Sequence, residues 1–327
     1  MSKSSRIIAV VVIAIILILA APAPPLKALN RYSGEDRYAT AVEICKSGWA
    51  NGSDVVILTR GDVYVDALAS VPLAYAHDAP VLLTLPNRLP AVTKDEIIRL
   101  NSSKIIIIGG STAVSQGVEA EIKALGVEIT RISGHNRFDT AAAIAAAVAP
   151  EGAESVFLAY GLNFPDALAA ASYAAISGIP ILLTRTAKLP EETAAALEAL
   201  NPEHIYVVGG TAVISDSVVK GLQNVERISG PNRFATAVAL AEKFATKANF
   251  MYVATGNDKS GGADAIAGAA LAAKEKKGIL LVGNSLPPVV AEFLGKQIED
   301  AVILGGSSAV SVEVAEDVQE ALYVPTP

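Results

Sequence analysis

The chain contains three copies of one sequence unit. Each copy has an opening block with two arginines six residues apart, then an Asp-Ala-Leu-Ala or Asp-Ala-Ile-Ala block, then a Gly-Gly block that ends in serine. A period of about 100 residues is too long for a solenoid repeat and fits a small domain. We therefore expect three related domains, at 29–128, 129–225 and 226–327, the last with a short tail. The blocks begin at residues 31, 66 and 108 in the first copy, at 131, 166 and 208 in the second, and at 227, 264 and 304 in the third.

Within each copy, short apolar runs alternate with longer alanine-rich segments. The runs at 105–108 and 181–183 are continuously apolar, which is typical of strands buried on both faces of a parallel sheet. Single helices between such strands indicate crossover connections. The sequence therefore predicts the α/β class, with a small, mainly parallel sheet between helices in each repeat. In the second copy we expect helices over 136–148, 165–177, 191–200 and 215–223, and strands over 155–159, 180–184 and 204–208.

The N-terminal segment has the pattern of a secretory signal peptide. Lys3 and Arg6 precede an apolar run from Ile7 to Ala21, which is shorter than the ~20 residues that a membrane-spanning helix needs. Prolines follow the run, and Ala28 offers a small residue at a cleavage site. We expect residues 1–28 to be a signal peptide, with an uncleaved N-terminal anchor as the alternative. Either form places the rest of the chain outside the membrane.

These blocks together resemble the cell-wall-binding repeat 2 family of secreted surface proteins. The resemblance rests on the Arg-Ile-Ser-Gly-x-Asn-Arg-Phe-x-Thr opening, the Asn-Phe-Pro-Asp-Ala-Leu-Ala block at 163–169 and the Gly-Gly-x-x-Ala-Val-Ser block. It implies three modules packed with pseudo-threefold symmetry at the cell wall or cell surface. It also implies noncovalent attachment to the wall through an anionic secondary wall polymer, with other surface-layer proteins as a further class of partner.

The second arginine of each opening block is a candidate polymer-binding residue. It lies at the predicted start of a helix, and its planar guanidinium matches phosphate or carboxylate groups. Exposed amides at the helix start would favour an anion there as well. One such arginine per repeat would give three linked sites that gain affinity together. The alternative is that each arginine pairs with the aspartate of its own repeat and stabilises the module. The residues are Arg37, Arg137 and Arg233, with the aspartates Asp66, Asp166 and Asp264.

Those aspartates are candidates for two roles. An aspartate near a helix start can cap the helix or favour its first turn, and it can also contact the arginine or a ligand. The segments before them differ among the copies, so the three sites need not be equivalent. The Gly-Gly pairs at 109, 209 and 305 fit a tight turn with positive φ. Nucleotide binding there is the weaker alternative, because no phosphate-binding glycine motif is present.

Composition and missing motifs exclude several classes of function. A net charge of −7 gives no support for nucleic-acid binding, and one cysteine excludes a disulfide scaffold or a multi-cysteine zinc site. No nucleophile-elbow or zinc-protease motif occurs. We therefore expect a binding protein rather than an enzyme, without cofactor or metal. A structural subunit of a surface layer or filament is the first alternative, and an exported enzyme or small-molecule binder is the second.

Overall fold

The structure is a computed structural model that describes residues 29–324 except 64–65, 246 and 258–261. The expected signal peptide, residues 1–28, lies outside the described residues. No helix among those described is both long enough and apolar enough to span a bilayer.

The second repeat follows the predicted order of helices and strands closely. Its last helix is the exception: it ends at Val219 rather than at residue 223, because Lys220 is extended and Gly221 has a φ of +94°. The elements are α6 (Arg137–Val148), β6 (Ser155–Tyr160), α7 (Pro165–Ile176), β7 (Ile181–Thr184), α8 (Glu191–Leu200), β8 (His204–Val208) and α9 (Asp216–Val219).

The other two repeats have the same order of elements. Repeat 1 differs in one place, because Pro72 lacks an amide hydrogen and the segment equivalent to α7 is divided into a short 3-10 turn and a helix. Repeat 1 comprises α2 (Arg37–Gly48), β2 (Val55–Arg60), η1 (Ala67–Ala69), α3 (Val71–Ala76), β3 (Val81–Thr84), α4 (Ala91–Leu100), β4 (Lys104–Ile108) and α5 (Gln116–Lys123). Repeat 3 comprises α10 (Arg233–Phe244), β10 (Phe250–Thr255), α11 (Ala263–Lys274), β11 (Gly278–Val282), α12 (Pro288–Gln297), β12 (Asp300–Leu304) and α13 (Val312–Ala321).

Each repeat also opens with a short strand, and this strand joins the sheet of the preceding repeat. The strand β5 (Glu128–Ile132) pairs with β4, and β9 (Val225–Ile228) pairs with β8. The strand β1 (Asn30–Tyr32) pairs with β12 at the other end of the chain, so the arrangement closes into a ring. The helix after each opening strand packs against a strand of its own repeat, as α2 does with β3, and also against the central helix of the neighbouring repeat, as α2 does with α11. The opening segment therefore connects two neighbouring repeats.

The three sheets have the same topology, which confirms the predicted α/β class. All strand pairs are parallel, and the orders are β3-β2-β4-β5, β7-β6-β8-β9 and β11-β10-β12-β1. The chain moves from β2 outward to β3 and then returns to β4 on the other side of β2. The carboxyl ends of β2 and β4 therefore flank a topological switch point, where open α/β sheets bind ligands.

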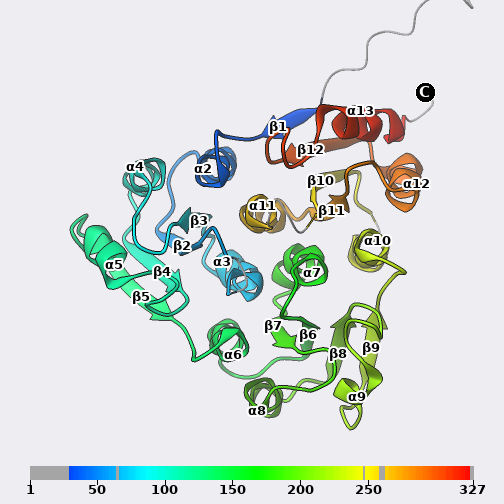
Figure 1. Ribbon diagram of the computed structural model, residues 1–327, viewed down its shortest axis with the longest axis horizontal. Coiled ribbons are helices and arrows are strands. Elements are labelled where there is room, and N and C mark those ends of the chain that lie inside the picture. The colour runs from blue at the N-terminus through cyan, green and yellow to red at the C-terminus, as the bar shows by residue number, and fades with distance from the viewer. Residues whose placement is uncertain (1–28, 64–65, 246, 258–261, 325–327) are drawn as a thin grey trace, which may run out of the picture.

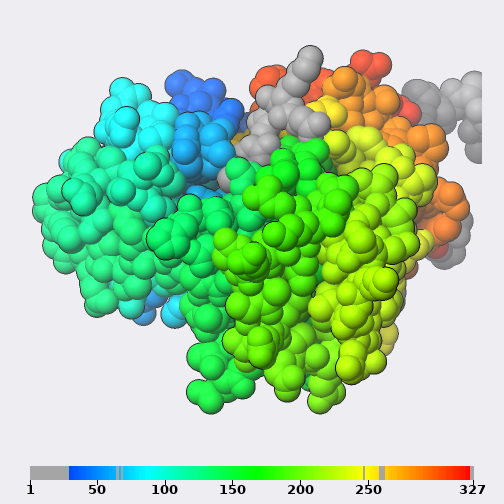
Figure 2. All heavy atoms as spheres, turned by 60° about the horizontal axis from the view of Figure 1, so that its bottom comes forward, coloured from blue at the N-terminus to red at the C-terminus, as the bar shows by residue number. Residues whose placement is uncertain are grey.

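Alanine-rich helices form the centre of the molecule. Figure 1 shows α3, α7 and α11 gathered in the middle, with the sheets and the remaining helices around them. These three helices contact one another, and nearly every described side chain of α7 and α11 is buried. Small side chains allow this close approach between helices. Figure 2 shows the second repeat in front, packed directly against its neighbours on both sides.

Candidate functional site

The two arginines of each opening segment bond to two different repeats. Arg131 Nη1 donates to Gly109 O of repeat 1 at 2.7 Å, and Arg137 Nη1 donates to Gly161 O of repeat 2 at 2.9 Å. The other two opening segments make the same pair of bonds. In the opening segment of repeat 1, Arg31 donates to Gly305 O of repeat 3 (2.7 Å) and Arg37 donates to Gly61 O of repeat 1 (2.7 Å). In the opening segment of repeat 3, Arg227 donates to Gly209 O of repeat 2 (2.7 Å) and Arg233 donates to Gly256 O of repeat 3 (2.6 Å).

The helix starts beside the candidate arginines offer fewer amides than expected. Arg137 is the first residue of α6, as predicted, but Asn136 Oδ1 accepts hydrogen bonds from the amides of Phe138 and Asp139 at 2.9 and 3.1 Å. Asp36 and Asn232 cap α2 and α10 in the same way. At each of these helix starts, the caps therefore occupy two amides that would otherwise be exposed.

Other recurring residues of the opening block stabilise its turn. Thr140 Oγ1 accepts a hydrogen bond from the Gly134 amide at 3.1 Å, and a Cβ at Gly134 would collide with Asp139. The same threonine bond occurs at Thr40 and Thr236. Sequence analysis did not assign roles to these residues, although their recurrence at a fixed spacing was the signal that could have found them.

The candidate aspartates do not cap their helices. Asp166 and Asp264 lie in the first turns of α7 and α11, and Asp66 precedes η1, but none makes a side-chain capping bond in the described part of the chain. Their Oδ2 atoms instead lie beside the first glycine of the Gly-Gly pair in the same repeat. A Cβ there would lie 3.1, 2.8 and 2.5 Å from that oxygen at Gly109, Gly209 and Gly305, whose φ values are +103°, +114° and +98°.

The charge of each candidate arginine acts on the aspartate of the preceding repeat in the ring. Burial raises the pKa of Asp66, Asp166 and Asp264, and the positive charges of Arg137, Arg233 and Arg37, respectively, oppose this rise. Among the described residues, Arg37 and Arg137 form no ion pair with a carboxylate. The alternative, in which each arginine pairs with the aspartate of its own repeat, finds no such ion pair among the described residues, because the opening segment lies against the neighbouring repeat. We name the sites junction 1–2 (Asp66, Arg137), junction 2–3 (Asp166, Arg233) and junction 3–1 (Asp264, Arg37).

Burial has a larger effect on these carboxyl groups than the arginines do. Loss of solvent raises the pKa of Asp166 to about 6, and the charge of Arg233 opposes this only in part. Burial likewise raises the pKa of Asp264 to about 6, and the pKa of Asp66 is raised for the same reason. The junctions therefore hold carboxyl groups that accept a proton more readily than ordinary aspartates do.

Open cavities lie at the junctions, at the carboxyl ends of the strands. The cavity at junction 3–1 has a volume of about 790 Å³, and the cavity at junction 2–3 about 390 Å³. A third cavity of about 500 Å³, beside junction 1–2, is lined by Gly110, Arg131 and His135 among others. In the described ranges, no group of three or more His, Cys, Asp or Glu residues is placed to hold a metal ion. The chemistry that these cavities offer is hydrogen bonding and charge.

Comparison with known proteins identifies relatives over the whole repeated region. The family described as cell wall binding domain 2 (CWB2) matches residues 31–119, 131–219 and 227–315. The chain is 37% identical over 294 residues to the N-acetylmuramoyl-L-alanine amidase LytC of Bacillus subtilis, which aligns 89% of this chain with 58% of that protein. It is 33% identical over 300 residues to the amidase enhancer of the same organism, which aligns 90% of this chain with 41% of that protein.

Solved structures show the same fold. Cwp6 from Clostridium difficile matches with a TM-score of 0.85 and 28% identity, over 93% of this chain and 49% of Cwp6. Cwp8 from the same organism matches with a TM-score of 0.81 and 31% identity, over 92% of this chain and 52% of Cwp8. The chain therefore spans about half the length of the relatives it matches.

Proposed function

The chain belongs to the cell wall binding domain 2 family, and on this basis we propose that it attaches noncovalently to the cell wall, outside the cell, by binding an anionic secondary wall polymer. In this proposal the junctions between repeats hold the polymer. The repeats supply binding and no catalysis, and other surface-layer proteins are a further class of partner.

The observation that supports this proposal most is the hydrogen bonding of the candidate arginines. Arg37 and Arg137 each use Nη1 to bond a glycine carbonyl, which fixes the position of the guanidinium. A guanidinium has five N–H donors, and those on Nε and Nη2 of both residues have no partner among the described residues. These donors and the positive charge remain for a phosphate or carboxylate of the polymer.

The ring arrangement also supports a polymer ligand. One arginine lies at each of the three junctions of a closed ring, so one long chain of repeating anions can contact more than one of them. Binding at linked sites raises the overall affinity without new kinds of contact. The excess of 33 acidic over 26 basic residues opposes approach of a polyanion, so local arginines must provide the attraction.

Sedimentation with cell walls tests the proposal. Purified residues 29–327 are mixed with isolated host walls before and after acid removal of the secondary polymers. The proposal expects retention on untreated walls and loss of retention on stripped walls. Equal sedimentation with both, or none with either, would contradict it and favour self-assembly as a surface-layer subunit.

A double variant tests the arginines. Arg137→Gln with Arg233→Gln should reduce wall retention strongly. The matched control removes the same charge at two exposed lysines, with Lys123→Gln and Lys296→Gln, and should retain binding. Each arginine variant also loses a hydrogen bond to a glycine carbonyl, so the melting temperature is measured alongside to confirm that the variant is folded.

A further inference from the structure

The first arginine of each opening block makes the same backbone contact in all three repeats. Arg31, Arg131 and Arg227 each donate from Nη1 to the first glycine carbonyl of the preceding Gly-Gly pair, at 2.7 Å in every case. Each arginine also has the same register in its sheet, opposite the second-last residue of strand β12, β4 or β8. The three guanidinium groups are therefore held in the same way, and their remaining donors face equivalent surroundings.

In two of the three repeats, a carboxylate binds the second terminal nitrogen of this arginine. Arg131 Nη2 donates to Glu119 Oε2 at 2.7 Å, and Arg227 Nη2 donates to Asp216 Oδ1 at 3.1 Å. Both acidic residues lie in the first turn of the helix that follows the Gly-Gly pair, which is α5 in repeat 1 and α9 in repeat 2. This place beside the arginine is therefore built to hold a carboxylate.

Repeat 3 does not supply that carboxylate. On α13, Ala315 occupies the position of Glu119, and Val312 occupies the position of Asp216. Among the described residues, Arg31 makes no ion pair, and its Nε and Nη2 have no acceptor. Burial alone lowers the pKa of Arg31, so no described carboxylate lies close enough to offset the loss of solvent around its charge. A half-buried guanidinium with unused donors is left short of hydrogen bonds.

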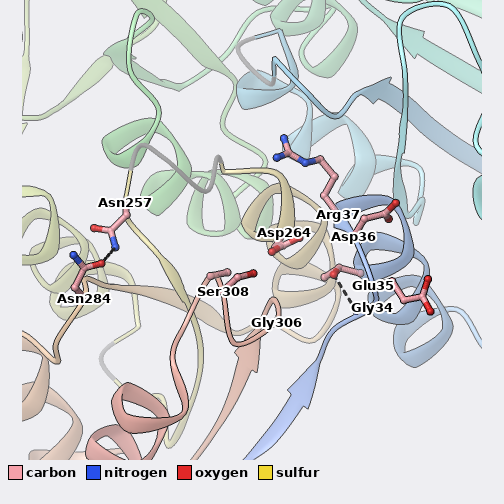
Figure 3. A pocket seen from close by; sticks show the side chains of 11 residues that line it. Gly34, Glu35, Asp36, Arg37, Asn257, Asp264, Asn284, Gly306 and Ser308 are labelled. Carbon is pink, nitrogen blue, oxygen red and sulfur yellow. Dashed lines mark hydrogen bonds between the residues drawn. The ribbon is translucent and has the colours of Figure 1, made fainter.

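Arg31 lies next to the cavity at junction 3–1. It bonds the carbonyl of Gly305, and the next residue, Gly306, lines that cavity (Figure 3). Arg37 extends into the same junction from the start of α2. Glu35 lies between the two arginines in the sequence, but its side chain points away from Arg37 in Figure 3. It forms no ion pair with either arginine in the described structure.

A guanidinium binds carboxylates and phosphates through charge-assisted hydrogen bonds. The segment before the described chain, residues 1–28, contains no Asp or Glu, so its side chains cannot provide the carboxylate. Resting on the proposed function, we infer that Arg31 binds an anionic group of the wall polymer, a carboxylate or a phosphate, at the place that Glu119 fills beside Arg131. Junction 3–1 then offers the polymer two arginines, whereas at the other two junctions an acidic side chain of the protein neutralises the first arginine.

Filling this place with a carboxylate of the protein tests the inference. Ala315→Glu gives repeat 3 the residue that pairs with Arg131 in repeat 1, and it should exclude an external anion from Arg31. Inorganic phosphate and, separately, acetate are titrated into the isotopically labelled chain from residue 29. The nuclear magnetic resonance signal of the Arg31 Nε–H group reports binding. The unsubstituted chain should show a saturable shift, and Ala315→Glu should weaken the apparent affinity by at least about tenfold.

Two further variants make this result specific. Val312→Asp reproduces the acidic residue of repeat 2 at an exposed position, so it should also block the probe without disturbing the fold. Gln319→Glu adds the same charge one turn further along α13 and is the matched control, with an affinity expected within about twofold of the unsubstituted chain. Melting temperatures are measured for all variants.

The reciprocal change opens the equivalent place in repeat 1. Glu119→Ala gives repeat 1 the residue that repeat 3 has, and it removes the carboxylate from Arg131. The Arg131 Nε–H signal should not respond to phosphate or acetate in the unsubstituted chain. It should gain a saturable shift in Glu119→Ala, because Arg131 is then left in the same state as Arg31.

Sedimentation with untreated host walls connects the site with the polymer. Ala315→Glu and Val312→Asp should lower the fraction of the chain that is retained, whereas Gln319→Glu should not. The inference is overturned if neither probe shifts the Arg31 signal, if the shift persists in both blocking variants, or if these variants are retained as well as the unsubstituted chain. Those outcomes leave the proposed function standing. An unsubstituted chain that is not retained would overturn the proposed function itself, and the assignment of the polymer to Arg31 with it.

Discussion

The aspartates at the junctions are the residues whose charge state responds most to pH. Asp166 and Asp264 have a pKa of about 6 in the folded chain, raised by burial from an ordinary value of 3.8. The folded chain therefore holds more protons than the unfolded chain between about pH 4 and pH 6. Because the unfolded chain binds fewer protons there, raising the pH lowers the free energy of unfolding across this window.

The double variant Asp166→Asn, Asp264→Asn should lose this pH dependence, because an amide does not ionise. Stability of both chains is measured by urea unfolding at fixed pH from 4 to 7. Relative to the variant, the unsubstituted chain should lose stability as the pH rises, on the order of 2 kcal/mol per carboxyl. Parallel stability curves for the two chains would show that these carboxyl groups titrate normally in the folded state.

The sequence was sufficient to name the residues of the junctions but not to pair them. Arg137, Asp66 and Asp166 all recur with the same period. A threefold pattern is unchanged if each arginine is assigned to the aspartate before it or to the one after it. The choice depends on where the opening strand lies, and a strand of three to five residues does not reveal which sheet it joins. The arginines also bond the backbone carbonyls of glycines, and because every residue has a backbone carbonyl, the sequence does not show which one accepts the bond.

At the scale of secondary structure, the three opening strands all pair with the last strand of the preceding repeat, but only two of them follow that repeat directly in the chain. The strands β5 and β9 continue from the repeat whose sheet they complete, whereas β1 reaches β12 only through noncovalent contacts. Three residues of β1 pair with its sheet, against five of β5 and four of β9. We therefore expect β1 to separate from its sheet more easily than the other two, since a segment with fewer pairs and no covalent link to its sheet opens at lower free energy.

Hydrogen exchange of three equivalent amides measures this difference. The Gly305 amide donates to Tyr32 O of β1 at 2.9 Å, and the amides of Gly109 and Gly209 donate to Ile132 O of β5 and Ile228 O of β9 at 2.9 and 3.0 Å. The Gly305 amide should exchange faster than the other two by about tenfold or more, which corresponds to about 1.4 kcal/mol in opening free energy. The other two amides are internal controls with matched geometry. Equal exchange of all three would mean that β1 is held as firmly as a continuous strand.

At the scale of the whole molecule, the repeats interlock rather than follow one another as separate domains. Each sheet is completed by a strand from the next repeat, and the central helices α3, α7 and α11 are buried against one another. We propose that the boundaries at 29–128, 129–225 and 226–327 mark units of sequence that do not unfold independently. A disturbance at one junction should then lower the stability of all three repeats together.

The contact between Tyr173 and Gly278 provides a test of this cooperativity. Gly278 occupies the position of Pro80 and Pro180 in the other repeats, and the Tyr173 ring from repeat 2 fills the space beside it. Gly278→Ala places a Cβ against the Tyr173 hydroxyl and should destabilise the chain by about 1–3 kcal/mol. Trp49, the single tryptophan, is buried at the contact between repeats 1 and 3, where Lys274 lies over its ring, so its fluorescence reports on a different junction.

In denaturant unfolding of Gly278→Ala, fluorescence of Trp49 and far-UV circular dichroism should shift to the same lower midpoint. Tyr173→Phe is the control, because its hydroxyl is buried with no hydrogen-bond partner in the described structure. Removing that hydroxyl should stabilise the chain by about 1 kcal/mol and should restore part of the loss in Gly278→Ala. A Trp49 midpoint that stays unchanged while the circular dichroism shifts would show that repeat 1 unfolds separately from repeats 2 and 3. The three junctions would then act as independent sites rather than as parts of one cooperative ring.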